Sequence, residues 1–233
     1  MKLNGIVGKG SGKLGASVWS ISGGEQVVRA YNPQVTNPST DAQVAQRAKL
    51  KLLSQLAAAL APGLGFKKIG LVSARNQFVS KNIGAAQYDE GVARITLTEI
   101  KLTPGMLTLG QISVGQRTGN NVACTISDVD AAYWDRVIYV SAKKSSDEKL
   151  TNVTVTQAVA GDNNDFAASV YAPDNGSIIY AYGVKFHSSG AKSRYENYDA
   201  AADVPYAELL AMLSNMFTNA TLSDTCAHNI LES

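Results

Sequence analysis

Several short patterns in the chain resemble chemical motifs, and each lacks something that its chemistry requires. Gly10–Gly15 reads Gly-Ser-Gly-Lys-Leu-Gly and matches the G-x-G-x-x-G pattern of dinucleotide sites. Such a site needs a buried strand before the loop and a helix after it. Here only Ile6-Val7 precedes the loop, a β-hairpin is expected after it, and Leu14 stands where a Walker loop has Ser or Thr. We interpret residues 1–15 as a flexible, Gly-rich arm.

The histidines, cysteines and carboxylates form no metal or acid–base pattern. His187 and His228 have no Cys, Asp or Glu at ligand spacing. Gly161–Asp165 is rich in carboxylates and amides but lacks the Gly and the distal Glu of an EF-hand loop, so it reads as a turn. Cys124 and Cys226 are too few for a disulfide framework. We expect a protein that is not an enzyme and has no cofactor, no metal and no small-molecule substrate.

The basic residues carry a clearer signal, because the two parts of the chain have opposite charge. Residues 1–82 hold eleven Lys and Arg against Glu25 and Asp41, whereas residues 83–233 hold ten against seventeen acidic side chains. A cationic head on an acidic body can bind a polyanion or pair with the body of a neighbouring copy. The candidate contacts with nucleic acid or a partner are Lys2, Lys9, Lys13, Arg29, Arg47, Lys51, Lys67 and Lys68.

The elements that hold these residues are a hairpin and two helices. Val18–Ile21 and Gln26–Tyr31 alternate on either side of a Ser-Gly-Gly turn, which is typical of a β-hairpin. Thr40 and Gln43 fit a capping box for a helix of about six turns. Its apolar stripe is Val44, Ala48, Leu52, Leu56 and Leu60, and Ala45, Leu53 and Ala59 widen it. A second, shorter helix is expected to carry Leu71, Ala74 and Phe78 and to end near Gly84.

The chain becomes β-rich after about residue 91. Seven runs rich in Val, Ile, Thr and Tyr are separated by polar turns: Arg94–Leu102, Leu107–Val114, Asn121–Ser127, Arg136–Ala142, Val153–Val159, Phe166–Tyr171 and Ile178–His187. This spacing predicts an immunoglobulin- or fibronectin-like β-sandwich with Trp134 and Tyr139 as core aromatics. The fold class is mainly β with helices (α+β). We divide the chain into 1–90 (arm, hairpin and helices), 91–202 (sandwich) and 203–233 (C-terminal amphipathic helix and a tail without a clear period).

The predicted C-terminal helix has an apolar face that needs a covering surface. It either folds back on the body or docks on another chain. The residues expected at such an oligomer interface are Leu209, Leu213, Met216 and Phe217. The start of the chain has no signal-peptide pattern, and no stretch approaches the roughly 20 apolar residues of a membrane span. We therefore expect no membrane contact and synthesis in a cytoplasm.

Residues 4–60 resemble one known family. The pattern is Asn4-Gly5-Ile6-Val7-Gly8, then Gly12-Lys13-Leu14-Gly15, a hairpin ending in Arg29, and Asn37-Pro38-x-Thr40-x-x-Gln43-x-x-x-Arg47-Ala48-Lys49. It is similar to a large family of uncharacterised proteins of about two hundred residues from gut Bacteroidota and their phages. Here Leu50 replaces the usual aromatic, and the helix after Asp203 extends past the typical end. The resemblance implies a virion component made in the bacterial host cytoplasm, and it implies no catalytic residues.

Two hypotheses follow from these observations. The first is a non-enzymatic structural protein of a bacteriophage or phage-like particle, whose partners are other copies of itself or other virion proteins. The second is a nucleic-acid-binding accessory protein that grips phosphates through residues 1–82. Trp19 and Tyr31 either stack on bases or fill the hairpin core. A surface-binding or carbohydrate-binding module is a third interpretation, which rests on analogy between folds alone.

Overall fold

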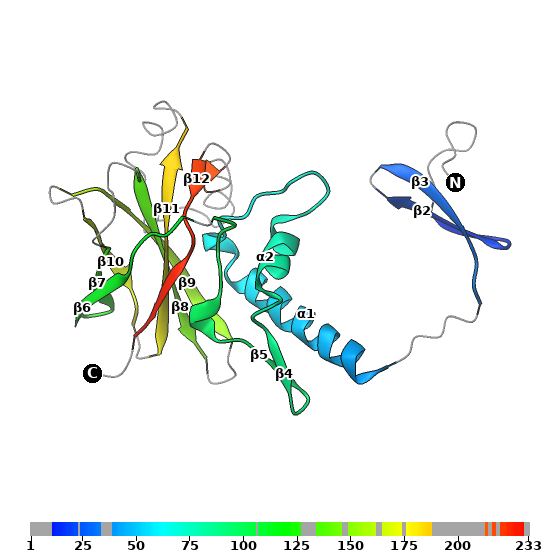
Figure 1. Cartoon of the computed structure of the whole chain (residues 1–233), viewed down its shortest axis with the longest axis horizontal. Coiled ribbons are helices and arrows are strands. Elements are labelled where there is room, and N and C mark those ends of the chain that lie inside the picture. Colours follow the sequence, from blue (N-terminus) through cyan, green and yellow to red (C-terminus); the bar gives the residue numbers. More distant parts are fainter. Residues whose placement is uncertain are drawn as a thin grey trace. The chain divides into compact units, whose positions relative to one another are not determined.

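Figure 1 gives the computed structural model of the chain. The structure describes residues 11–22, 24–33, 39–105, 107–126, 134–145, 149–161, 165–173, 176–187 and 220–230, together with Leu213, Met216 and Phe217. The chain divides into two units, Met1–Gln43 and Val44–Ser233. We call the strands of the first unit the arm sheet and the whole second unit the body.

This division falls near residue 43, whereas we expected boundaries near residues 90 and 202. The body extends across both expected boundaries because its helices, its central sheet and its C-terminal residues share one buried cluster. Leu53 and Phe78 from the helices lie in that cluster with Tyr180 from the sheet and with Phe217 and Leu222 from the end of the chain. Burying these side chains together removes apolar surface from water, so the helices and the sheet fold as one unit.

The arm sheet is antiparallel and has the strand order β1-β2-β3. Its strands are β1 (Gly12–Leu14), β2 (Ser17–Ser22) and β3 (Glu25–Ala30). The predicted hairpin is confirmed as β2 and β3. The Gly-rich stretch before it, which we expected to be a flexible arm, instead contributes β1. Gly15 takes a φ of +59° between β1 and β2, a conformation in which glycine carries no steric penalty, and the chain reverses there.

The two predicted helices are confirmed, with one correction to their residues. They are α1 (Asp41–Ala59), which is followed by the short 3-10 helix η1 (Ala61–Gly63), and α2 (Ala74–Asn82). The Thr40 Oγ1 atom accepts a hydrogen bond from the Gln43 N–H at 3.4 Å, as the capping box predicts. Leu71, expected inside the second helix, lies before it. That helix begins at Ala74 because the Ser73 hydroxyl accepts a hydrogen bond from the Asn76 N–H at 3.2 Å and acts as its N-cap.

The apolar stripe predicted for α1 is only half correct. Leu56 and Leu60 are buried, but Val44 is 39% exposed. A residue every four positions advances 40° around a helix of 3.6 residues per turn, so a stripe of this spacing turns away from the core along its length. Leu53, predicted to widen the stripe, is buried, and Ala57 completes the buried face of the helix. No residue of α1 before Leu53 is buried.

The β-rich part of the body contains two larger sheets and a short hairpin. The hairpin consists of β4 (Gln87–Asp89) and β5 (Val92–Arg94). The three-stranded sheet has the order β10-β7-β6 and contains β6 (Ile112–Thr118), β7 (Asn121–Ile126) and β10 (Phe166–Tyr171). The five-stranded sheet has the path β12-β11-β8-β9 with β13 also on β11, and contains β8 (Arg136–Lys144), β9 (Leu150–Val159), β11 (Ser177–Phe186), β12 (Ala220–Leu222) and β13 (Cys226–Asn229).

Five of the seven predicted strands are confirmed, and the first two are wrong in extent. The strand expected at Arg94–Leu102 ends at Arg94 and is followed by the 3-10 helix η2 (Leu97–Glu99). Side chains from elsewhere bond the backbone at residues 101 and 102, so no strand ladder forms there. The strand expected at Leu107–Val114 begins only at Ile112, two residues after Gly110, whose φ of +97° interrupts the extended run.

Both faces of the five-stranded sheet are buried, which makes it the middle layer of the body. On one face, Val140 and Tyr180 pack with α1 and α2. On the other face, Tyr139 and Ala181 pack with residues of the three-stranded sheet. The central strands β8 and β11 are therefore buried almost throughout, as expected for strands between two layers. Trp134 and Tyr139 are buried in this second cluster, as predicted.

The end of the chain forms an edge of the five-stranded sheet. The strands β12 and β13 both pair with β11, at Val184–Phe186 and at Ile178–Ala181. The tail, for which we expected no clear structure, thus supplies two strands of the sheet. Strands of three and four residues are too short for alternation to be recognised.

Candidate interaction surfaces

The arm sheet holds two of the predicted cations in one row. Alternate residues of a strand face opposite sides, and directly paired residues share a side. Lys13, Val18 and Arg29 are paired across the three strands, so both cations lie on the same face of the arm sheet. The Lys13 Nζ atom lies 3.6 Å from the centroid of the Tyr31 ring, a cation–π contact. Lys2 and Lys9 lie outside the described residues.

The opposite face of the arm sheet is the apolar one. Trp19 and Val28 are paired on this face, and Leu14 and Ile21 also belong to it. Leu14 is 70% exposed and Ile21 is 48% exposed. The Trp19 indole N–H has no hydrogen-bond acceptor among the described residues, although the atom itself is shielded from solvent. Within the described part of the first unit, no second layer of structure covers this face.

The body carries the other predicted cations on its helical side. Arg47 and Lys51 lie one turn apart on the exposed side of α1, and Lys67 and Lys68 are exposed before α2. Residues 42–88 contain seven Lys and Arg and no Asp or Glu. The structure therefore places Arg47 near Lys51 and Lys67 near Lys68, in a segment whose sequence contains no Asp or Glu.

Three of the four residues predicted at an oligomer interface are used by the body itself. Leu213, Met216 and Phe217 have helical backbone and are at most 3% exposed. They belong to the cluster that joins the helices to the five-stranded sheet, where the Phe217 ring meets the Tyr182 ring at 5.9 Å between centroids. Leu209 lies outside the described residues. These three side chains thus fold back on the body, which is one of the two alternatives expected, and they offer almost no surface to another chain.

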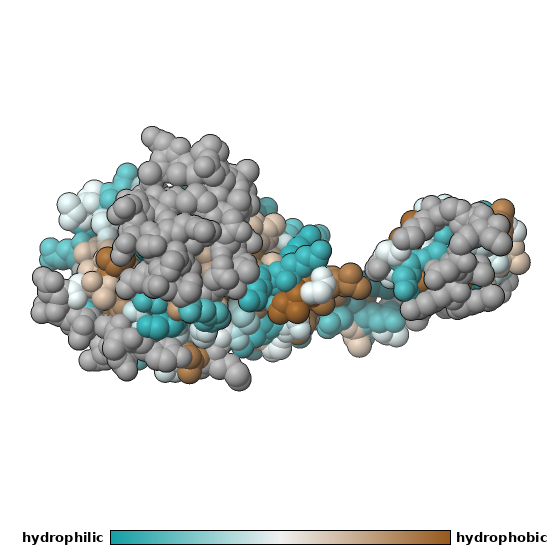
Figure 2. Space-filling view, turned by 90° about the horizontal axis from the view of Figure 1, so that it is seen from above, coloured by the Kyte–Doolittle hydropathy of each residue, from teal (hydrophilic) through white to brown (hydrophobic). Residues whose placement is uncertain are grey.

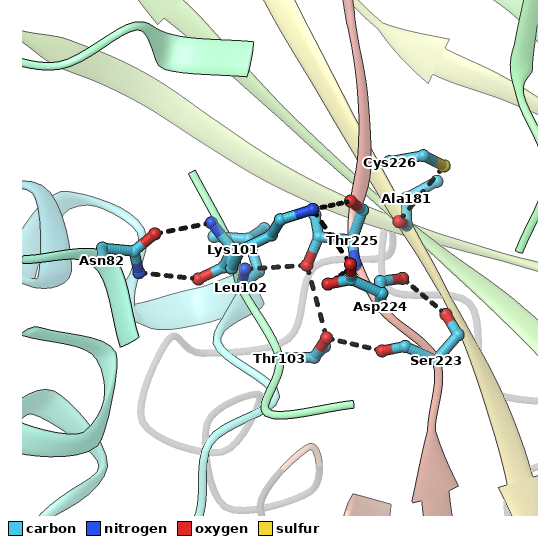
Figure 3. Close-up of polar contacts among 9 residues, drawn as sticks. All are labelled: Asn82, Lys101, Leu102, Thr103, Ala181, Ser223, Asp224, Thr225 and Cys226. Carbon is cyan, nitrogen blue, oxygen red and sulfur yellow. Dashed lines mark hydrogen bonds and ion pairs between the residues drawn. The ribbon is translucent and has the colours of Figure 1, made fainter. Parts of the chain in front are cut away.

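A network of polar contacts holds the C-terminal strands against the segment after η2 (Figure 3). The side-chain amide of Asn82 makes two hydrogen bonds to the backbone of Lys101. Its Oδ1 accepts from the Lys101 N–H at 2.8 Å, and its Nδ2 donates to the Lys101 carbonyl at 3.0 Å. The Lys101 Nζ atom in turn lies 3.0 Å from Asp224 Oδ2. We call this network the C-terminal clamp; its residues are Asn82, Lys101, Leu102, Thr103, Ser223, Asp224 and Thr225.

Two further hydrogen bonds of the C-terminal clamp are buried, and each joins a threonine hydroxyl to a backbone group. The Thr103 hydroxyl donates to the Ser223 carbonyl at 2.6 Å, and the Thr225 hydroxyl accepts from the Leu102 N–H at 2.8 Å. Gly105 allows the two segments to approach, since a Cβ there would lie 2.1 Å from the Leu222 carbonyl oxygen. These partners are about 120 residues apart in sequence, so no local pattern could have identified them.

The two cysteine thiols of the body have raised pKa values. Desolvation by burial raises the pKa of the Cys124 thiol to about 12 and is the main cause that raises the pKa of Cys226 to about 11. Both thiols are therefore protonated at neutral pH. His187 is exposed and contacts Thr221, 2.9 Å from its Nε2 to the hydroxyl. Within the described residues, no three His, Cys, Asp or Glu side chains come together as a metal ion would require.

No protein-family model, curated protein or solved structure matches this chain. Among the described helices, none combines the length and the apolar character needed to cross a membrane. Among the described residues, two surfaces stand out as candidates for binding: the apolar face of the arm sheet and the cation-bearing helical side of the body.

Proposed function

We propose that the protein is a non-enzymatic structural subunit of a bacteriophage or phage-like particle. In this proposal the arm sheet makes contacts with neighbouring subunits and the body is a stable building block. The resemblance of residues 4–60 to a family from gut Bacteroidota and their phages supports the setting. The exposed apolar face of the arm sheet carries the argument for the role.

Among the described residues of the first unit, nothing forms a second layer that would stabilise the arm sheet. A three-stranded sheet gains stability when one apolar face is covered by a second layer. Gln26 is the one buried residue among the described residues of the strands β1, β2 and β3. A second copy of the chain would supply a covering layer for the exposed side chains of Leu14 and Ile21. Such an arm adds interface beyond that of the body.

We also infer the finer architecture of the body. We propose that its two larger sheets form a fibronectin-like sandwich. One sheet would hold β6, β7 and β10, and the other would hold β8, β9, β11 and the C-terminal strands. The strand orders β10-β7-β6 and β13-β11-β8-β9 support this connectivity. A C-terminal helix ending near Phe217 is part of the same proposal, supported by the helical backbone of Leu213, Met216 and Phe217. Sandwiches of this kind commonly serve as interaction modules, which is an argument from fold analogy.

A charge-matched pair of variants tests the subunit role. Leu14→Lys with Ile21→Lys adds two cations to the apolar face, and Ser20→Lys with Ser22→Lys adds two cations to the opposite face of the same sheet. Multi-angle light scattering at low salt should detect assembly of the unmodified chain and of the Ser variant, and mainly monomer for the Leu14/Ile21 variant. A chain that stays monomeric at every concentration contradicts the proposal, as does equal assembly of both variants.

The second candidate is a nucleic-acid-binding accessory protein. The run of seven cations without an acid in residues 42–88 favours it, as does the row of Lys13 and Arg29 on the arm sheet. Contacts to phosphate would give an affinity that falls with salt by roughly 0.7–0.9 log units per log unit of salt for each phosphate. Filter binding of single- and double-stranded DNA at low salt measures this slope. No retention of either DNA removes the second candidate and leaves the first.

A further inference from the structure

A short turn before α2 presents apolar and basic side chains together. Ile69 and Val72 exchange two backbone hydrogen bonds of 3.0 Å, and Gly70 takes a φ of +57° at the turn between them. Leu71, at its tip, is 80% exposed, the largest value among the described large apolar residues. The Gln77 side chain donates to the Lys67 carbonyl and ties the base of the turn to α2. We call residues 67–72 the basic turn, because Lys67 and Lys68 flank it.

A second turn in the same helical layer has the opposite charge. The hairpin of β4 and β5 reverses through Glu90 and Gly91, which have φ values of +48° and +82°. Asp89 and Val92 form its last pair and are both exposed, Val92 by 48%. We call residues 89–92 the acidic turn. Arg94 lies on the same face but at the base of the hairpin, two residues beyond the last pair, so the tip itself is negative.

The two turns lie at opposite ends of this layer of the body. In Figure 1 the chain before α2 loops out at the top, whereas the hairpin of β4 and β5 points to the bottom. Figure 2 looks onto the upper end, where brown apolar residues lie beside teal hydrophilic ones. Among the described residues, no ion pair holds Lys67, Lys68, Asp89 or Glu90. Each end therefore presents an unneutralised charge beside an exposed aliphatic side chain.

We propose that the basic turn of one copy docks on the acidic turn of a second copy. Lys67 and Lys68 would pair with Asp89 and Glu90, and Leu71 would cover Val92. Because the two surfaces differ and point away from each other, the contact is heterologous. Repeating it generates a ring when the rotation closes and a filament when it does not. This inference rests on the proposed subunit role and names the surfaces that would meet.

The expected contact is weak on its own. Two hairpin tips bury less than the roughly 1,200 Å² of the smallest standard interfaces, so the arm sheet must supply the remaining area. Charge complementarity at such a contact sets the register of the subunits and excludes wrong pairings more than it adds affinity. The contact should therefore weaken as salt rises above about 0.15 M.

Charge reversal at each end tests the proposal in the full-length chain. Lys67→Glu with Lys68→Glu gives two acidic turns, and Asp89→Lys with Glu90→Lys gives two basic turns. Each variant alone should associate at least about tenfold more weakly than the unmodified chain, because like charges then face each other. An equimolar mixture of the two variants should regain association, and so should one chain that carries all four changes. Lys144→Glu with Lys149→Glu makes the same charge change at exposed positions near the end of β8 and the start of β9 and should have little effect.

A zero-length carbodiimide cross-link gives a direct readout of the same contact. It joins a lysine amine to a carboxylate only when the two touch. A mixture of ¹⁵N-labelled and unlabelled chains should yield a mixed-isotope peptide pair that links residue 67 or 68 to residue 89 or 90. Unmodified chains that assemble without this cross-link overturn the proposal, as does equal assembly of both reversal variants or no recovery in their mixture.

The outcomes separate this inference from the proposed function. Assembly that is lost in the Leu14/Ile21 variant but kept in both reversal variants contradicts the contact between turns and leaves the subunit role standing. A monomeric unmodified chain contradicts both. Assembly that is lost in either reversal variant and regained in their mixture supports the contact.

Discussion

The strands β2 and β11 both belong to antiparallel sheets, but they differ in how many of their residues are buried. Every residue of β11 except Lys185 is buried, since this strand lies between two other strands and between two buried clusters. No residue of β2 is buried. The chain thus contains one sheet that is covered on both faces and one that no described residue of its own unit covers. Strand formation follows from local pattern, but stability follows from a second layer.

This contrast agrees with the proposed function, in which the body is a stable building block and the arm sheet contacts neighbouring subunits. The body can be a rigid block because it holds its C-terminal strands with the C-terminal clamp and buries aromatic rings on both sides of its middle sheet. The arm sheet keeps an apolar face and a cationic row on opposite sides. A region with few buried contacts is where a protein can respond to a partner, because little internal structure must be broken there.

The largest expected effect is in the core of the body. Phe78 is fully buried, and its ring contacts Phe66 edge to face at 6.1 Å between centroids. Phe78→Ala should lower the free energy of unfolding by about 3–5 kcal/mol, through lost burial and a residual cavity. Urea denaturation followed by far-UV circular dichroism measures this change. Leu71→Ala, seven residues away and largely exposed, should change it by less than about 0.5 kcal/mol. Similar losses in both variants would mean that the basic turn belongs to the core.

The next effect comes from the C-terminal clamp. Asn82 is 1% exposed and makes three hydrogen bonds to backbone groups of Phe78 and Lys101. Asn82→Leu should cost about 2–3 kcal/mol, because it leaves buried backbone groups without partners. Asn76→Leu on the exposed side of α2 is the matched control and should cost less than about 0.5 kcal/mol. Faster hydrogen exchange at residues 226–229 in the Asn82 variant alone would link the loss to the C-terminal strands.

The sequence predicted the helices and strands better than it predicted how they pair and pack. The hairpin, both helices and five strands follow from local periodicity and from caps such as Thr40. The role of β13 does not, because Cys226–Asn229 carries no alternation and is defined by its pairing with β11. The exposure of Leu71 was also missed, since a leucine near a helix start suggests a core position. The basic and acidic turns depend on Gly70 and Gly91, whose φ angles the sequence alone does not fix.

A smaller effect appears in the dependence of stability on pH. Burial raises the pKa of Cys124 from an ordinary value of 9.0 to about 12. Between these values the folded chain holds a proton that the unfolded chain has lost. The stabilisation is thus complete below pH 9 and declines as the pH rises towards 12. Between about pH 8 and pH 10, Cys124 alone should account for a loss of about 1 kcal/mol.

Cys124→Ala is the test of this pH dependence. The variant should start from a lower stability but lose about 1 kcal/mol less than the unmodified chain over the same pH interval, as measured by urea denaturation at both ends. Cys226 also has a raised pKa, so part of the decline should remain. Parallel declines in the two proteins would show that Cys124 titrates normally and is not enclosed by the two sheets.

The smallest expected effect tests the comparison most directly, because the chain's two tryptophans report on different units. Trp19 lies in the arm sheet and Trp134 in the body. With Trp134→Phe or Trp19→Phe as background, the emission of the remaining tryptophan follows one unit. Ile21→Ala should shift the urea transition seen by Trp19 and change the free energy of unfolding seen by Trp134 by less than about 0.5 kcal/mol.

The dependence of these two transitions on protein concentration shows what covers the arm sheet. The cover is either a second copy of the chain or other residues of the same chain. If a second copy covers it, the midpoint seen by Trp19 should rise with protein concentration by mass action, while the midpoint seen by Trp134 changes less. Coincident transitions that do not depend on concentration would mean that the two units unfold together as one cooperative system. In that case the arm sheet is stabilised within its own chain, and its apolar face is not available to a neighbour.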